Sequence, residues 1–259
     1  MMRFSSLGSG SSGNATLVEA GDAARPTRLL VDCGFSLREL GRRLGARGVE
    51  PGQIDAVFIT HEHGDHVGCA LTLARRHGVR LCMSAGTWAA LGQDDAPASL
   101  HLMACGDMLD IGALQLKPFA VPHDASEPLQ LRVHDGHHHL GVLTDLGEAG
   151  DEVAQALAGC DALLLEANHD RELLQSGPYP WFLKRRISGR LGHLENSLAA
   201  ALLQRLHHDG LRHVVAAHLS RQNNRPDLAA QAFATALGTC AQDIVVADPA
   251  QGCGWLDLH

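Results

Sequence analysis

Six consecutive residues, His61-Glu62-His63-Gly64-Asp65-His66, supply side chains of the kind that bind transition-metal ions. Imidazole and carboxylate groups are common protein ligands of zinc and related divalent metals. In an extended segment His61 and His63 project to one side, and a turn at Gly64 brings Asp65 and His66 to a second position. One short loop can therefore supply ligands to two neighbouring metal ions. The alternative is a His-rich surface loop, although packing rarely calls for these residues directly after an apolar run such as DAVFIT.

Two metal ions with open coordination positions need further donors from elsewhere in the chain. The candidates are His123 in VPHDA, Asp145 in LTDLG and His218 in AAHLS. Each of them alone is equally well interpreted as a hydrogen-bonded turn or core residue. Together they complete a centre in which two divalent ions, about 3.5 to 4 Å apart, lower the pKa of a shared water and polarise a phosphoryl or carbonyl oxygen. The chemistry predicted is hydrolysis.

The elements that must position these ligands follow from the apolar pattern. Short apolar runs that end in turn residues predict strands at 16–19, 28–32, 56–60, 79–83, 114–121, 129–134, 139–143, 162–166, 214–217 and 244–247. Helical periodicity predicts helices at 36–46, 65–77, 147–158, 196–209 and 227–237. Strands come first in hairpin-like series and then alternate with helices, which predicts sheets in the middle with helices outside. Most candidate ligands fall at or just after a strand end, where short loops form a rigid platform.

The composition is that of a soluble globular enzyme, with 45% hydrophobic and 19% charged residues among 259. We find no linker, low-complexity tract or repeat, and therefore expect one domain over residues 1–259. No apolar run reaches the roughly 18 residues of a membrane span, and the first residues lack the apolar core of a signal peptide. We therefore expect a cytoplasmic protein that does not associate with a membrane.

Cysteines and charge narrow the functional class. The seven cysteines are scattered and form no C-x-x-C pair, so we expect reduced thiols rather than disulfides or a structural zinc site. The formal net charge of −8 argues against a protein that coats nucleic acid through a broad basic face. A local positive patch remains compatible with that charge.

The ligand order His-x-His-x-Asp-His, then His, Asp and His, resembles the metallo-β-lactamase superfamily. The resemblance implies an α/β fold, a four-layer αβ/βα sandwich, and two divalent metal ions, with Zn²⁺ favoured and Mn²⁺ or Fe²⁺ as alternatives. It also implies one metal on His61, His63 and His123, a second on Asp65, His66 and His218, and Asp145 as the bridge. Asp32 is expected to hold a ligand imidazole in the correct tautomer. Its alternative role is that of a strand-end carboxylate capping a turn.

Further motifs resemble the WalJ/YycJ-like branch of nucleases within that superfamily. They cover essentially the whole chain: GSGSSGN at 8–14, LLVDCG at 29–34, THEHGDH at 60–66, EANHD at 166–170, GPYP at 177–180, LKRRISGRLGHLEN at 183–196 and HLSRQNN at 218–224. Two positions depart from the pattern, Gly64 where Ser is expected and Glu195 where a small polar residue is usual. Neither departure removes a ligand.

The ligand set narrows the reaction. A Cys in place of Asp145 would favour a β-lactamase and a Glu in place of His63 a di-iron oxidoreductase, so the set resembles the phosphodiesterase and thioesterase branches. His193 precedes an Ala-rich helix, as does the histidine that protonates the leaving oxygen in the phosphodiesterase branch. In the same comparison Glu166 matches the carboxylate that orients it. The alternative for His193 is a surface histidine next to a helix cap.

Polar and basic residues near these motifs are the expected substrate contacts. The basic run beside His193 suits a phosphate backbone, and the Gly/Ser turn at 9–14 can present backbone N–H groups to a phosphate. Their alternatives are a solvated helix face and a simple hairpin turn. The substrate-binding residues that we predict are Ser11, Ser12, Asn14, Lys184, Arg185, Arg186 and Asn223.

The function predicted is a dinuclear metal-dependent phosphodiesterase, a DNA exonuclease that uses metal-activated water, with Asp65, His193 and Glu166 as catalytic residues. Its expected partner is a nucleic acid or another phosphodiester. One alternative is a glyoxalase-II-like thioesterase or other small-ester hydrolase. Another is a non-catalytic metal-binding partner protein, whose expected signature is a lost ligand.

Overall fold

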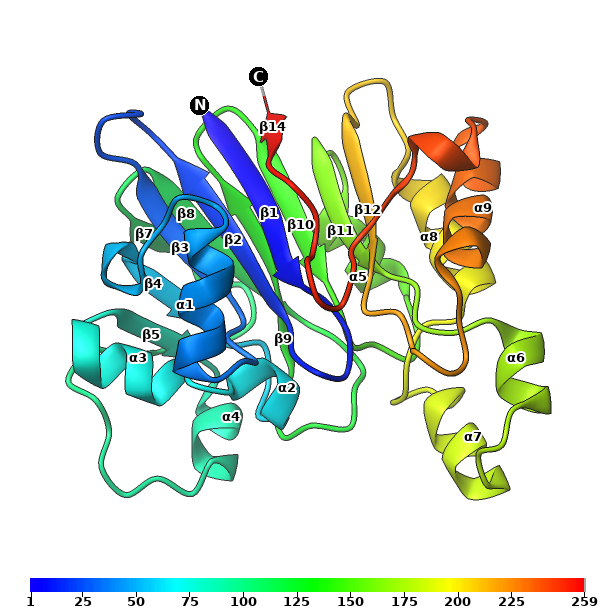
Figure 1. Cartoon of the computed structure of the whole chain (residues 1–259), viewed down its shortest axis with the longest axis horizontal. Coiled ribbons are helices and arrows are strands. Elements are labelled where there is room, and N and C mark those ends of the chain that lie inside the picture. The colour runs from blue at the N-terminus through cyan, green and yellow to red at the C-terminus, as the bar shows by residue number, and fades with distance from the viewer. Residues whose placement is uncertain (259) are drawn as a thin grey trace.

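Two mixed β-sheets lie face to face in the middle of the molecule, with helices on both outer sides (Figure 1). The computed structural model describes residues 1–258, and within them each sheet has seven strands. In spatial order, the first sheet contains β14 (Leu256–Leu258), β1 (Met2–Gly8), β2 (Ala15–Ala20), β3 (Thr27–Val31), β4 (Ala56–Phe58), β5 (Arg80–Met83) and β6 (Leu100–Leu102). The second contains β13 (Val245–Val246), β12 (His213–Ala217), β11 (Ala162–Glu166), β10 (His139–Leu143), β9 (Leu129–His134), β8 (Leu114–Ala120) and β7 (Leu109–Ile111).

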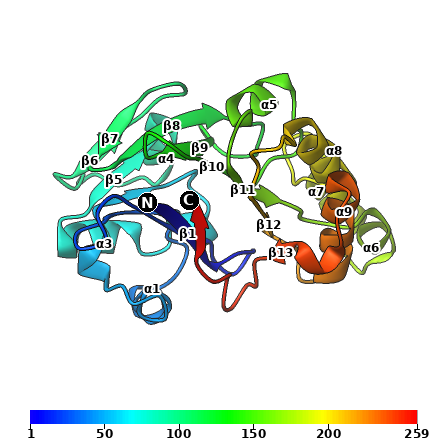
Figure 2. The same ribbon diagram turned by 90° about the horizontal axis from the view of Figure 1, so that it is seen from above.

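The helices form the two outer layers. Those that follow strands of the first sheet are α1 (Leu37–Gly45), α2 (Gly64–Val67), α3 (Ala70–His77) and α4 (Ala85–Ala90). Those of the second half are α5 (Asp151–Leu157), α6 (Arg171–Ser176), α7 (Trp181–Ile187), α8 (Asn196–Leu206) and α9 (Pro226–Leu237). Seen from above, α1 and α3 lie on one side of the paired sheets and α8 and α9 on the other (Figure 2). This arrangement confirms the predicted four-layer sandwich.

Three apolar clusters hold the four layers together, because successive residues of a strand point to opposite faces of a sheet. In β3, Leu29 and Val31 belong to the core between the sheets, whereas Leu30 belongs to the cluster that includes α1 and α3. In β11, Leu164 faces the core between the sheets and Leu163 faces α5, α8 and α9. Both faces of these strands are therefore buried, which explains why their sequences are continuous apolar runs.

The predicted helix over 65–77 is divided into α2 and α3 by Gly68, which corrects the prediction. Gly68 has φ 38°, and a Cβ at this position would collide with the backbone carbonyl of Cys33. Close approach of the segment after β3 therefore ends the first helical turn. The break leaves Asp65 and His66 on a short helix of their own, separate from the rest of the helical layer.

Several observed elements were not predicted from the sequence, namely β1, β6, β7, β14, α4, α6 and α7. In β1 the buried residues Ser5 and Ser6 interrupt the apolar pattern. The Ser5 hydroxyl donates a hydrogen bond to the carbonyl of Cys253. β1 pairs with β14 from the other end of the chain, a contact that local sequence cannot indicate. Among residues 1–258, no helix has the length and hydropathy that crossing a bilayer requires.

Candidate metal centre and active site

The first predicted ligand set comes together at one edge of the two sheets. His61 and His63 lie in the loop after β4, and His123 lies in the loop after β8. His63 Nδ1 is 3.0 Å from His61 Nε2 and 3.4 Å from His123 Nε2. The potential donor atoms of all three lie within 4.8 Å of one another. Three imidazole nitrogens that converge in this way can hold one metal ion.

The second predicted set converges beside the first. Asp65 and His66 lie on α2, and His218 follows β12. Asp65 Oδ2 is 3.7 Å from both His66 Nε2 and His218 Nε2. Their donor atoms also lie within 4.8 Å of one another.

Asp145, which follows β10, lies between the two sets. Its Oδ2 is 2.9 Å from His66 Nε2, and its Oδ1 is 4.0 Å from His123 Nε2. Burial alone would raise the pKa of Asp145, but His218 and His66 hold that pKa well below its ordinary value. The side chain is therefore a carboxylate, and its position suits the predicted bridging role.

Two buried histidines beside the first sheet, His66 and His61, each have a hydrogen-bond partner for Nδ1, the ring nitrogen that faces away from the centre. His66 Nδ1 is 2.7 Å from Asp32 Oδ2, which is the role predicted for Asp32. Thr60 Oγ1 lies 3.0 Å from His61 Nδ1, and it also contacts Asp32. These partners fix the ring orientation and direct Nε2 toward the centre.

Equivalent contacts hold the histidines on the side of the second sheet. His123 Nδ1 donates to the carbonyl of Gly192 at 3.1 Å. His218 Nδ1 donates to Glu166 Oε1 at 2.9 Å. Burial alone would lower the pKa of His218, but Asp145, Asp65 and Glu166 raise it to about 10.

The backbone is strained at three of these positions. Asp32, Asp145 and His218 have φ values of 63°, 55° and 54°, and within residues 1–258 they are the only non-glycine residues with positive φ. Each lies directly after, or two residues after, a strand of the sandwich. Such conformations are costly and persist where the surrounding structure over-determines them, commonly at functional sites. The strain turns three side chains from different strands toward one centre.

The donor set fits divalent metal ions. His218 Nε2 is buried and has no hydrogen-bond partner in the described part of the chain, although it points toward Asp65. A buried polar atom without a partner is unfavourable unless something else binds it. Imidazole nitrogen and carboxylate oxygen are suitable donors for such an ion. A metal ion bound to His218 Nε2 would supply the partner that this buried atom lacks.

His193 and Glu166 form the predicted pair next to the centre. His193 Nδ1 donates to Glu166 Oε1 at 2.9 Å. Burial alone would raise the pKa of Glu166, but His193 and His218 lower it to about 2. Burial alone would lower the pKa of His193, and the charge of Glu166 raises it overall. Glu166 contacts His193, as predicted, and also His218, a candidate metal ligand. The sequence did not indicate the second contact.

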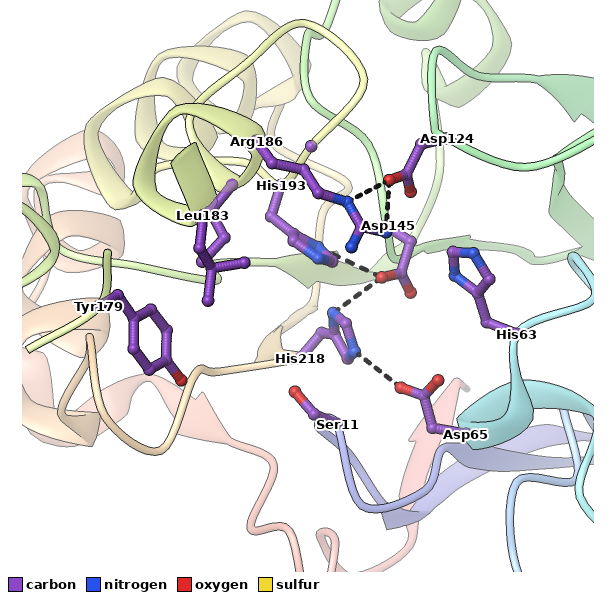
Figure 3. A pocket seen from close by; sticks show the side chains of 12 residues that line it. Ser11, His63, Asp65, Asp124, Asp145, Tyr179, Leu183, Arg186, His193 and His218 are labelled. Atoms are coloured by element: carbon purple, nitrogen blue, oxygen red, sulfur yellow. Dashed lines mark hydrogen bonds and ion pairs between the residues drawn. The ribbon is translucent and has the colours of Figure 1, made fainter. Parts of the chain in front are cut away.

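A cavity of about 280 Å³ opens onto this centre (Figure 3). His193, His218, Asp145, Asp65 and His63 form its polar side. The opposite wall is more apolar and comes from α7 and the segment before it. The residues of that wall are Tyr179, Leu183 and Ile187.

The predicted substrate contacts divide into three groups. Ser11 and Arg186 line the cavity. Ser12, Lys184 and Arg185 lie outside its lining: Ser12 Oγ accepts a hydrogen bond from Arg221, Lys184 Nζ donates to the carbonyl of Gln175, and Arg185 is exposed.

Asn14 and Asn223 depart from the expectation, because both are buried and neither lines the cavity. Asn14 Nδ2 lies 3.3 Å from the Asp65 carbonyl and 3.1 Å from His66 Nε2, so it supports the ligand loop. Asn223 accepts a backbone hydrogen bond from Asp170. Asn14 thus holds the ligand loop through its side-chain amide, whereas Asn223 contacts Asp170 through its backbone carbonyl.

Asp124 and Tyr179 are among the cavity residues that the sequence analysis did not predict. Asp124 follows His123 directly, and its Oδ2 forms an ion pair with the Arg186 guanidinium at 2.6 Å. This pair joins the loop after β8 to α7 across the cavity (Figure 3). Tyr179 was not predicted either. Its place between GPYP and the basic run was the available signal for a role near the substrate.

The comparisons with known proteins agree with this geometry. A profile of the β-lactamase superfamily domain matches residues 27–219. The chain is 36% identical to exodeoxyribonuclease WalJ of Streptococcus pneumoniae serotype 2, over 88% of this chain and 85% of that protein. It is 32% identical to exodeoxyribonuclease YycJ of Bacillus anthracis, over 88% of this chain and 86% of that protein. A solved metallo-β-lactamase fold protein, YhfI of Bacillus subtilis, superposes with a TM-score of 0.75 at 17% identity and 98% coverage of both chains.

The fold and the His/Asp cluster define a metal-dependent hydrolase. The chain belongs to the β-lactamase superfamily and, within it, to the family of the WalJ and YycJ proteins. The resemblance predicted from the sequence motifs is thereby confirmed.

Proposed function

We propose that this protein is an exodeoxyribonuclease that hydrolyses DNA phosphodiesters with two divalent metal ions, Zn²⁺ being favoured over Mn²⁺ or Fe²⁺. The observation that carries the proposal is the pair formed by His193 and Glu166 beside two convergent ligand sets. An imidazole positioned next to the metal ligands is what a phosphodiesterase needs, because an alkoxide leaving group must be protonated. The names of the WalJ and YycJ relatives support DNA as the substrate.

The proposed ligands of one ion are His61, His63 and His123, those of the other are Asp65, His66 and His218, and Asp145 serves both. When bound, such ions lower the pKa of a water and stabilise negative charge on the phosphoryl oxygens.

The side chains beside the metal ligands are proposed to transfer a proton and to orient the imidazole rings. Glu166 holds the Nδ1 proton of His193, so Nε2 is the nitrogen that remains for the substrate. Glu166 stabilises the charged ring and raises the pKa of His193, which favours a proton on Nε2. His193 would pass this proton to the leaving oxygen of the DNA strand. Asp32 and Glu166 accept the Nδ1 protons of His66 and His218, which leaves Nε2 of each ring as the nitrogen that would bind metal.

The test compares leaving groups. His193→Ala should retain its metals and most of its activity on a nitrophenyl phosphodiester, because nitrophenolate leaves without protonation. On DNA it should lose on the order of 10²- to 10⁴-fold in kcat, the usual contribution of a positioned general acid. His137→Ala, which changes an exposed histidine outside the cavity lining, is the matched control. A proportional loss on both substrates would refute the general-acid role, and faster hydrolysis of thioesters than of phosphodiesters would refute the proposed reaction.

We also propose that residues 1–259 act as one domain in the cytoplasm. The core between the sheets, which includes Phe4 from the first sheet and Leu131 and Val215 from the second, supports a single folding unit. The seven cysteines are free thiols, as suits a reducing compartment.

A further inference from the structure

Helix α7 carries two exposed aromatic side chains at its start. Trp181 is 70% exposed and Phe182 is 61% exposed, and their ring centroids lie 6.3 Å apart in an edge-to-face arrangement. No residue of α7 is buried. The helix therefore contributes these rings to the surface, and they do not belong to any of the three apolar clusters.

Exposed rings are unusual in this protein. The whole chain has only 3 Trp, 1 Tyr and 6 Phe residues. Among residues 1–258, every aromatic residue other than Trp181 and Phe182 is buried or half-buried. A single exposed apolar side chain needs no explanation, but adjacent exposed rings on a projecting helix mark an interaction surface. Figure 1 shows α7 projecting away from the paired sheets.

These rings stand next in the chain to residues of the active-site cavity wall. Tyr179, two residues before Trp181, lines the cavity together with Leu183 and Ile187 (Figure 3). One side of α7 thus faces the cavity, and its first turn presents Trp181 and Phe182 to solvent. Aromatic side chains thus lie both in the cavity wall, at Tyr179, and on the exposed start of α7, at Trp181 and Phe182.

The surroundings of the rings carry positive charge. On a helix, residues three and four positions apart are neighbours, which places Trp181 beside Lys184 and Arg185. The Arg185 side chain is exposed and forms no ion pair or hydrogen bond within the described residues. These cations stand out on a chain whose formal net charge is −8. Rings and cations together complement a ligand that has both flat apolar groups and negative charge.

We propose that Tyr179, Trp181 and Phe182 form a stacking surface for the unpaired bases of a DNA strand whose phosphodiester lies in the cavity. The proposal rests on the proposed function, and it specifies the substrate as a strand whose terminal bases are not paired. Stacking on aromatic rings, with cations along the phosphate backbone, binds single strands of any sequence because every base has a flat face. The cations of α7 contact the phosphates, and the rings hold the bases that follow the scissile bond.

The experiment measures Kd by fluorescence anisotropy with a labelled single-stranded oligonucleotide whose phosphorothioate linkages resist hydrolysis. The metal-loaded wild type is compared with Trp181→Ala, Phe182→Ala and the double variant. Each lost stacked base should raise Kd by about 5- to 150-fold. Met108→Ala is the matched control, because Met108 is 68% exposed and lies outside the active-site cavity. It should leave Kd unchanged.

A second oligonucleotide separates stacking from charge. Its terminal nucleotides are abasic, so they keep the phosphates and lack the rings. Wild type should bind this strand more weakly than the intact strand. The double variant should show a smaller difference between the two strands, the part that Tyr179 retains. An undiminished effect of the substitutions on the abasic strand would overturn the proposal, since the rings would then not act through bases.

Two further measurements identify other occupants of the surface. Sedimentation of wild type with phosphatidylglycerol–phosphatidylcholine vesicles, lost in the double variant while oligonucleotide Kd is unchanged, would overturn the proposal in favour of a membrane. A dimer in analytical ultracentrifugation that the double variant abolishes, again with unchanged Kd, would overturn it in favour of a second copy. Hydrolysis of a nitrophenyl phosphodiester is measured in parallel. Its absence from wild type would count against the proposed function, whereas the Kd comparison tests stacking separately.

Discussion

Replacing Glu166 by Gln tests the electrostatic design of the site most directly. The side chain is fully buried, and its two oxygens accept four hydrogen bonds. Oε1 lies 2.9 Å from both His193 Nδ1 and His218 Nδ1, and Oε2 accepts the backbone N–H groups of Leu146 at 3.0 Å and Leu194 at 3.1 Å. Gln has the same shape but only one oxygen. Whichever way its amide turns, its NH₂ group meets two N–H donors.

The expected magnitude follows from that mismatch. With the amide oxygen on the backbone N–H groups, the NH₂ faces both imidazoles, which must then move the proton from Nδ1 to Nε2. Each lost hydrogen bond to a charged group is worth about 1.5 to 3 kcal/mol. A proton on Nε2 of His218 blocks metal binding, so metal affinity should fall by about 10- to 100-fold. At saturating metal, kcat on DNA should stay about 10-fold low, because His193 is misoriented, and this is less than the loss expected for removing the acid itself.

Asp32→Asn is the matched control, because Asp32 supports His66 at 2.7 Å and makes no contact with His193. Asn also tolerates the positive φ of 63° at this position. This variant should lose about 10- to 100-fold in metal affinity and recover full DNA hydrolysis at saturating metal. The assay is kcat on DNA and on a nitrophenyl phosphodiester across a metal titration. Full recovery of DNA hydrolysis by Glu166→Gln would refute its role in orienting His193.

Three further predictions concern ligands, substrate and backbone. His63→Ala should lower metal content and activity together because it removes a predicted donor, and elemental analysis that finds the wild-type metal content would contradict the ligand assignment. Replacing the three cations at 184–186 by Ala should raise KM for DNA more than for a small diester and flatten the salt dependence of binding; equal effects on both substrates would indicate a structural role. Gly68→Ala should lower the free energy of unfolding by about 3 kcal/mol in urea denaturation, since its Cβ would collide with the carbonyl of Cys33. Gly64→Ala, whose Cβ meets no atom within 4 Å, should leave that free energy nearly unchanged, and similar losses in both variants would argue against the collision.

Local sequence was informative wherever a feature depends on neighbours in the chain. The loop His61 to His66 follows an apolar strand, and its spacing alone places four ligand candidates within six residues. The apolar runs of β3 and β11 are continuous because both of their faces are buried, and this made the strands predictable. The sequence pattern did not predict β1, because its buried residues include the polar Ser5 and Ser6 and because its partner strand β14 lies at the other end of the chain.

The tertiary structure decided how separate segments meet. Glu166 and His193 are 27 positions apart, and only the parallel placement of β10, β11 and β12 with the loop before α8 brings Glu166 within reach of both His193 and His218. The contact of Asp124 with Arg186 likewise joins loops from different layers. Sequence by itself determined the types and order of the ligands, because these depend on residue chemistry and short-range spacing. Which ring nitrogen faces the centre, and which backbone positions bear positive φ, depends on the long-range packing of the two sheets, and no local pattern encodes it.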